Sequence, residues 1–179
     1  MNPFRILSGI ALAAATFGMS GCLSVSKSAD MVANVSNIVN KHPESLSVSV
    51  SSIRPPNIAN TDILSTAEFT EAIKTSILQS GVFARTAATG AADYDLGVEI
   101  VRVDLPMMGF SMTVTMEATW RLMRRGDQKP VWQKAIMSTF TARASEAFAG
   151  ATRVRLANVG AARENIKDAI TQMGALTLP

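Results

Sequence analysis

The sequence has only one cysteine, Cys22, and one histidine, His42, among its 179 residues. A chain with a single cysteine forms no intramolecular disulfide, and it holds no His/Cys cluster for zinc. A Ser/His/Asp or Cys/His catalytic arrangement would depend on His42 alone. That residue precedes Pro43 in a polar stretch with no acid placed to orient it, which favours a solvated linker residue over a base. We therefore expect no enzyme activity, no cofactor and no metal site.

Other chemical signatures are equally sparse. Aromatic residues make up 6% of the chain, too few for the stacking platforms that bind single-stranded nucleic acid, so no nucleic-acid partner is expected. The sequence has no glycine-rich phosphate loop. Several carboxylates follow one another along a predicted strand, and they are read as solvated charges in preference to an acid/base pair: Asp93, Asp95, Glu99 and Asp104.

The first 21 residues have the pattern of a secretory signal. Arg5 is followed by the apolar run "ILSGIALAAATFG", which is closed by the small residues Ser20 and Gly21. The apolar run is shorter than the roughly 20 residues that a bilayer-spanning helix needs, and no second long run follows it. We expect residues 1–21 to be removed from the mature protein.

The stretch "MSGC" at residues 19–22 resembles the lipobox of bacterial lipoproteins. The resemblance implies that the Cys22 sulfur is diacylated and that cleavage makes Cys22 the first residue, whose amino group is then acylated too. Residues Leu23 and Ser24 follow, and by resemblance to lipoproteins of the enteric type the absence of aspartate there implies export to the outer membrane, with the protein facing the periplasm. Two or three acyl chains hold a protein on a bilayer for practical purposes permanently.

The 158 residues that remain after removal of the signal suffice for one domain. Residues 22–45 are rich in Ser, Asn, Lys and Asp and are interpreted as a lipid anchor and linker. A short helix starting near Asp30 is compatible with the spacing of Met31 and Val35. Residues 46–179 are predicted to form a single periplasmic α+β domain.

Within this domain, hydrophobic periodicity predicts strands at "LSVSVSSI", "VFART", "YDLGVEIVRVD", "MTVTMEATWRL" and "VWQKAIMSTFTA". The third of these strands changes phase near Ile100, which predicts a bulge. A helix is expected from a capping box at Ser65 to Gly81, and a second from about Phe148 to Met173. The predicted fold is an α+β two-layer sandwich, with a mixed sheet of about four long strands, one short strand and two helices on one face. The other face of the sheet is expected to stay polar.

Charge is distributed unevenly along the chain. Residues 22–104 hold six basic and nine acidic side chains, whereas residues 105–179 hold ten basic and five acidic ones. A basic patch is predicted in one hairpin, at Arg121, Arg124, Arg125, Lys129 and Lys134. Such a patch attracts anionic lipid, lipopolysaccharide phosphate or an acidic partner, and a merely solubilising surface is the alternative.

The stretch "LPMMGF", residues 105–110, is apolar although it lies between two predicted strands. Its residues Leu105, Met107, Met108 and Phe110 either cap the open end of the core or contact a partner, an apolar groove or a bilayer surface.

The order of elements, with "EAIKTSILQSGVF" and "YDLGVEIVRVD", resembles small periplasmic accessory lipoproteins. These include auxiliary lipoproteins of ABC lipid-transport systems, the lipoprotein of the lipopolysaccharide-assembly barrel and activators of penicillin-binding proteins. The resemblance implies a non-catalytic accessory or assembly subunit of an envelope transport or biogenesis complex. The alternative is a periplasmic lipid or glycolipid carrier with an apolar cavity, motivated by the methionines Met107, Met108, Met112, Met116, Met123 and Met137.

Overall fold

The computed structural model describes residues 26–53, 64–106 and 108–179 of the chain. The elements follow in the order α1 (Ser28–Met31), β1 (His42–Ser52), α2 (Thr66–Ser80), β2 (Phe83–Thr86), β3 (Tyr94–Asp104), β4 (Met112–Arg124), β5 (Lys129–Ala142) and α3 (Gly150–Met173). Helix α1 is a single turn, whereas α2 and α3 have 15 and 24 residues.

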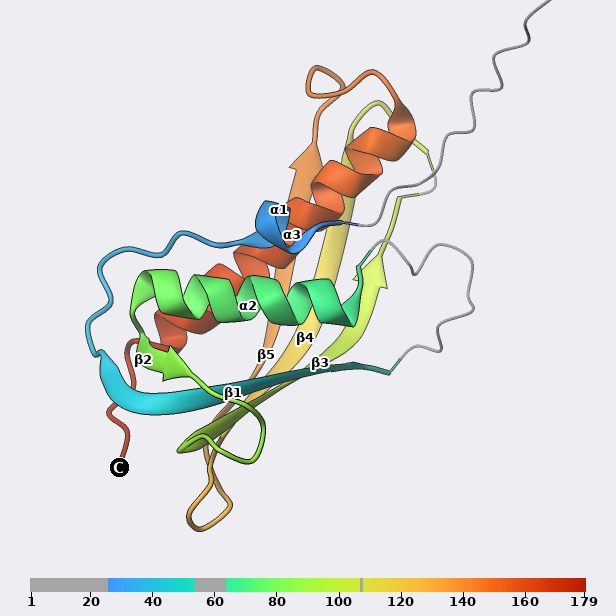
Figure 1. Ribbon diagram of the computed structural model, residues 1–179. Helices are drawn as coiled ribbons and strands as arrows, with labels where there is room; N and C mark the ends of the chain where they lie inside the picture. The colour runs from blue at the N-terminus through green and yellow to red at the C-terminus, as the bar shows by residue number, and fades with distance from the viewer. Residues whose placement is uncertain (1–25, 54–63, 107) are drawn as a thin grey trace, which may run out of the picture.

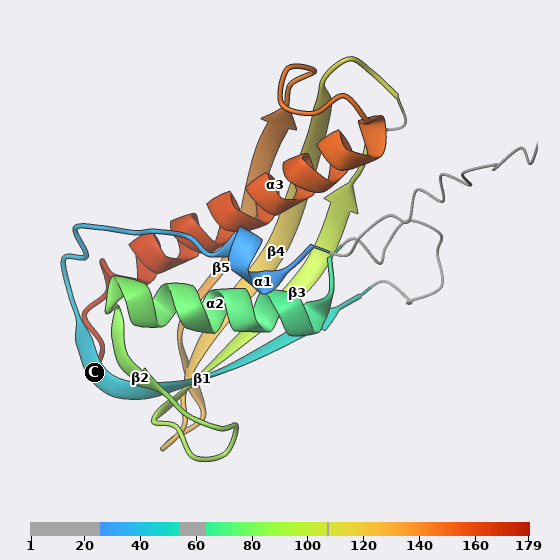
Figure 2. The ribbon, with the colours of Figure 1, turned by 45° about the horizontal axis from the view of Figure 1, so that its top comes forward.

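The five strands form one mixed sheet in the order β2-β1-β3-β4-β5. Strand β1 is parallel to both of its neighbours, β2 and β3. Strands β3, β4 and β5 form an antiparallel meander. Helices α2 and α3 lie across one face of this sheet, as both ribbon views show (Figure 1, Figure 2). The predicted α+β two-layer fold is confirmed.

Strand β4 shows why the sheet has one apolar and one polar face. Its even-numbered residues from Met112 to Leu122 are buried beneath the helices, while the residues between them point to the other side. Trp120 is fully buried, and its indole Nε1 donates a hydrogen bond to Asn165 Oδ1 at 2.8 Å. The Asn165 amide in turn donates to the carbonyl of Ile136 at 2.9 Å, so that α3 is held to β4 and β5 by a satisfied buried network.

Helix α2 begins and ends where its capping residues predict. The Ser65 hydroxyl accepts a hydrogen bond from the Glu68 backbone N–H, and Gly81 ends the helix in the left-handed conformation with φ 68°. A capping box would bring the Glu68 carboxylate back to Ser65. Instead, that carboxylate accepts a hydrogen bond from the backbone N–H of Ser28. The cap thus stabilises a contact with a distant part of the chain.

The predicted irregularity in β3 is also present. The pairing of β3 with β4 shifts register between Ile100 and Arg102. After the shift, Val103 lies opposite the buried Met116, and Arg102 lies opposite Glu117 on the polar face. The bulge therefore keeps an apolar residue over the core although the sequence alternation changes phase.

The segment interpreted as a linker is packed over the part of it that the structure describes. Ser26, Met31 and Ala33 are buried, and Ala33 N–H donates to Ser76 Oγ on α2 at 2.9 Å. The sequence of this segment predicts a linker because the segment contains few apolar residues. The residues against which those few pack lie far away in the chain.

His42 corrects the sequence interpretation in the same way. It is buried and is the first residue of β1, so this strand begins four residues before the predicted Leu46. Its Nε2 lies 3.1 Å from the carbonyl oxygen of Met173, and its ring packs on Phe83 with centroids 4.9 Å apart. His42 therefore has a packing role and is not a solvated linker residue.

Candidate functional site

Cys22 lies outside the described residues, and the described chain begins four residues later, at Ser26. The backbone N–H of Ser28 is bonded to Glu68, and Asp30 pairs with Arg155 of α3 at 3.1 Å. Arg163 donates a further hydrogen bond to the backbone carbonyl of Asp30. The hydrogen bond from Ser28 lowers the pKa of the Glu68 carboxyl. The chain is thus attached to both large helices within a few residues of Cys22.

One end of the domain is formed by two connections that lie side by side. They are the β3–β4 connection, residues 105–111, and the β5–α3 connection, residues 143–149 (Figure 1, Figure 2). Met112 and Ala142, the residues next to them, are paired across β4 and β5. A Cβ atom placed on Gly150 would lie 3.5 Å from the Met112 Cε, which confirms that the second connection returns over the start of β4.

The β3–β4 connection contains the predicted apolar residues, and they divide into two groups. Leu105 is half-buried and packs against the core. Met108 is 86% exposed and Phe110 is 89% exposed. Between them, Gly109 has φ 153° and a Cβ there would approach the Ser111 carbonyl oxygen to 3.0 Å, so the turn requires glycine. Met107 lies outside the described residues.

The β5–α3 connection adds an aromatic residue that sequence reasoning missed as a surface feature. Phe148 is 101% exposed. The Arg153 guanidinium donates to the carbonyl oxygens of Ala147 and Phe148 at 3.0 and 3.1 Å, and so fixes the backbone that presents Phe148. No local signal in the sequence identifies Phe148 as exposed. It comes just before an amphipathic helix, where an apolar residue would ordinarily pack against the core. Together Met108, Phe110 and Phe148 are termed the apolar end.

The opposite end contains the tight turn between β4 and β5, and most of the predicted basic patch lies there. Arg124 forms a bidentate pair with Asp127, and Lys129 lies 3.5 Å from the same carboxylate. Arg125 pairs with Asp95 and donates to the carbonyl of Ala92 at 2.8 Å. Hydrogen bonding from Arg124 holds the pKa of Asp127 far below its usual range. These residues are termed the hairpin end, where cations are largely matched by carboxylates.

The remaining two residues of the predicted patch lie on different faces of the sheet. Arg121 is on the polar face and donates to Gln133 Oε1 at 3.1 Å. Lys134 is opposite Trp120 in register, and therefore belongs to the helix-covered side. The five basic residues are neighbours in sequence, but the structure does not gather them into one unpaired surface.

The face of the sheet away from the helices is polar, as predicted. Two threonine pairs cross β4 and β5, Thr113 with Thr141 at 2.9 Å and Thr115 with Thr139 at 3.1 Å. Met137 is exposed among these polar residues. The methionines considered for a carrier cavity are divided between the two faces, because Met116 is buried on the helix side and Met137 is not.

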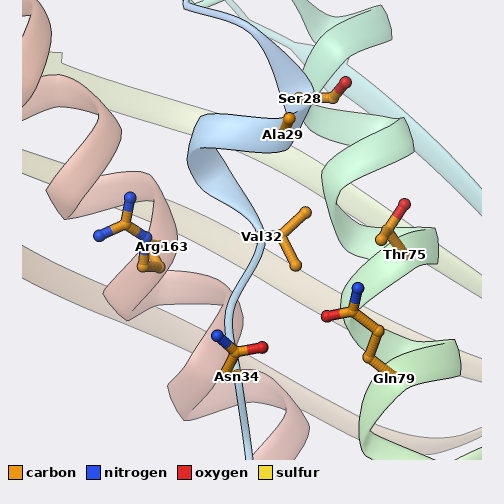
Figure 3. A pocket seen from close by; sticks show the side chains of 7 residues that line it. All are labelled: Ser28, Ala29, Val32, Asn34, Thr75, Gln79 and Arg163. Atoms are coloured by element: carbon orange, nitrogen blue, oxygen red, sulfur yellow. The ribbon is translucent and has the colours of Figure 1, made fainter.

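A hollow of about 580 Å³ lies between the N-terminal segment, α2 and α3. Figure 3 shows its lining residues, Ser28, Ala29, Val32, Asn34, Thr75, Gln79 and Arg163. Most of them are polar, and the hollow is open to solvent. Its composition does not match the apolar cavity that a lipid carrier would need.

Two further properties bear on function. Within residues 26–53, 64–106 and 108–179, no three His, Cys, Asp or Glu side chains are grouped so as to hold a metal ion. None of the helices in these ranges is long and apolar enough to cross a bilayer.

Comparisons with known proteins give structural but not sequence relatives. No family model matches the chain, and no curated protein matches it. Protein XCC0632 of Xanthomonas campestris, a DUF330 protein, is similar in structure with a TM-score of 0.57 and 15% identity, over 76% of this chain and 91% of that one. Protein CT253 of Chlamydia trachomatis is similar with a TM-score of 0.54 and 11% identity, over 76% of this chain and 100% of that one. The chain therefore shares the fold of these two bacterial proteins.

Proposed function

We propose that the protein is a non-catalytic lipoprotein, anchored through acylated Cys22 in the outer membrane and facing the periplasm. In this proposal it acts as an accessory or assembly subunit of an envelope transport or biogenesis complex. The observation that carries the proposal is the signal-like segment that ends in "MSGC", directly followed by a folded domain. Only cysteine at that position supplies the thiol needed for a thioether-linked lipid.

The packing of the N-terminal segment supports this arrangement. Ser26 is already buried, and only three residues separate it from Cys22. An extended chain advances about 3.5 Å per residue, so the domain would be held within roughly 14 Å of the acylated residue. A domain positioned so closely suits work at the membrane surface, such as support of a neighbouring complex.

The sheet supports a binding role more than a catalytic one. Its polar face is broad, and β5 lies at the edge of the sheet with a length of 14 residues. An edge strand and an uncovered face can both receive a protein partner. Two of the carboxylates in the strand region of β3 are engaged within the chain, since Asp95 pairs with Arg125 and Asp93 accepts hydrogen bonds from Ser45. The Ser45 hydrogen bonds lower the pKa of the Asp93 carboxyl.

The direct test replaces Cys22 with Ser and follows the protein through fractionation of the envelope. We expect the variant to lose its outer-membrane association, or to accumulate as a precursor that keeps residues 1–21, with the domain still folded. Affinity purification of the acylated wild type, after cross-linking in cells, should then recover components of an envelope complex. Outer-membrane association of Cys22→Ser equal to wild type would refute the anchor, and recovery of no envelope protein would refute the accessory role.

A further inference from the structure

The apolar end lies on the same side of the domain as the start of the N-terminal segment. β1 and β3 are parallel, and both end on this side. Ser28 is bonded to Glu68 in the first turn of α2, which follows the end of β1. In both ribbon views the described chain begins near the end of β3, below the two connections that carry Met108, Phe110 and Phe148 (Figure 1, Figure 2).

Helix α3 provides a measure of the separation. Asp30 pairs with Arg155 and its carbonyl oxygen accepts a hydrogen bond from Arg163, and these arginines lie five and thirteen residues after Gly150, the first residue of the helix. A rise of 1.5 Å per residue places them about 8 and 20 Å from Gly150 along the helix axis, and these two distances bracket the position of Asp30. The tether from Ser26 back to Cys22 spans up to roughly 14 Å. The acylated residue and the apolar end can therefore reach one bilayer surface at the same time.

We propose that the apolar end is a second membrane contact, in which Phe110, Phe148 and Met108 insert into the phospholipid leaflet that holds the acyl chains of Cys22. This inference rests on the lipid anchor of the proposed function. It adds an orientation: the ends of β1 and β3 face the membrane, and the hairpin end points away from it.

The shape of the apolar end favours lipid over a protein pocket. The three side chains are almost fully exposed, and they belong to two neighbouring connections at one end of the domain. Hot-spot residues of protein interfaces pack into fitted pockets, whereas a fluid leaflet accommodates separate protruding side chains.

The opposite side of the molecule provides a matched control. Val39 is apolar and 81% exposed, like the residues of the apolar end. The adjacent Asn40 N–H donates to the carbonyl oxygen of Gly174, at the C-terminal end of α3, so Val39 lies at the far end of that helix from Phe148. A thiol at Val39 should therefore remain in water when the apolar end meets the membrane.

The test uses the acylated full-length mature protein with one introduced cysteine, in the variants Phe110→Cys, Phe148→Cys and Val39→Cys. Because the natural Cys22 is blocked by acylation, a thiol-reactive environment-sensitive fluorophore labels only the new site. The labelled proteins are reconstituted in vesicles of phosphatidylethanolamine and phosphatidylglycerol, and quenching by doxyl groups on the phospholipid acyl chains is measured.

We expect quenching at positions 110 and 148 to exceed that at position 39 by roughly fivefold or more. Equal quenching at all three positions, in protein that stays bound to the vesicles, would overturn this inference and leave the anchor intact. Labelling of the wild-type protein at Cys22, with no vesicle binding, would overturn the anchor and the inference together. Protection of positions 110 and 148 in isolated outer membranes without quenching in vesicles would point to a protein partner and would also overturn it.

Discussion

The two ends of the sheet differ in whether their side chains have partners within the chain. At the hairpin end, Arg124 and Lys129 meet Asp127, and Arg125 meets Asp95, so the charges find partners within the chain. At the apolar end, Phe110 and Phe148 expose nearly their whole surface. A charged side chain that is paired within the chain already has its hydrogen bonds satisfied. By contrast, the burial of an exposed aromatic ring against an apolar surface has a favourable free energy. Of these two ends, the apolar end is the one that would gain from burial against another apolar surface.

The largest expected effect comes from breaking the core that both ends share. Trp120→Asp places a carboxylate in a fully buried site and removes the indole donor to Asn165. We expect a loss of about 4 kcal/mol or more in the free energy of unfolding, enough to unfold the domain. Thr119→Asp, one residue earlier and on the polar face, should change it by less than about 1 kcal/mol. Urea denaturation measures both, and equal losses would show that the assignment of faces is wrong.

The second-largest effect tests whether the aromatic residues of the apolar end belong to the core. Because Phe110 and Phe148 contact little of the domain, replacing both with Ser should shift the melting temperature by no more than about 2 °C. Hydrogen exchange of residues 105–111 and 143–149 on vesicles should become several-fold faster than in the wild type. Val39→Ser is the control and should keep wild-type exchange. A large fall in melting temperature in the double variant would mean that these rings belong to the core.

A smaller effect is expected at the hairpin end, and on stability alone. Arg125→Ala removes the pair with Asp95 and the hydrogen bond to Ala92. Since these groups are about one-third exposed, the loss should be about 1 kcal/mol. Arg121→Ala, which removes only a surface contact with Gln133, should have almost no effect. Membrane contact should be unchanged in both, and weaker vesicle quenching at position 148 in Arg125→Ala would break the proposed division between the ends.

The smallest effect is a pH dependence of the N-terminal segment. The hydrogen bond from Ser28 lowers the Glu68 pKa in the folded protein, so its stabilisation is present above the unfolded pKa and is lost as the pH falls through the folded pKa. The protection factor of the Ser28 amide, which compares its exchange rate with the intrinsic rate at the same pH, should therefore fall in acid. Glu68→Gln should lower this protection factor at neutral pH and make it independent of pH, while Glu71→Gln on the same helix should behave as wild type. Acid sensitivity that survives in Glu68→Gln would assign the effect to another group.

Local patterns in the sequence predicted most of the domain. The alternation of β4, the Ser65 cap and the Gly81 stop each depend on neighbouring residues, and the structure contains them as expected. Even the bulge after Ile100 is a local signal, because a change of phase within one strand reveals it.

The parts that were missed depend on contacts between distant residues. Asp30 and Arg155 are 125 residues apart, and His42 meets Met173 across 131 residues. Neither pairing can be recognised from local composition, which therefore predicts a linker where the structure has a packed segment. The candidate site was predicted in part for the same reason: Met108 and Phe110 stand out as an apolar loop, whereas Phe148 joins them only through the pairing of β4 with β5.

The central claim is that the mature protein is a lipid-anchored domain beginning at Cys22. The most direct measurement is the intact mass of the protein purified from outer membranes. The account predicts a mass equal to residues 22–179 plus two or three acyl chains, with fragmentation placing all of the added mass on Cys22. An unmodified Cys22, whether residues 1–21 are retained or removed, would contradict it.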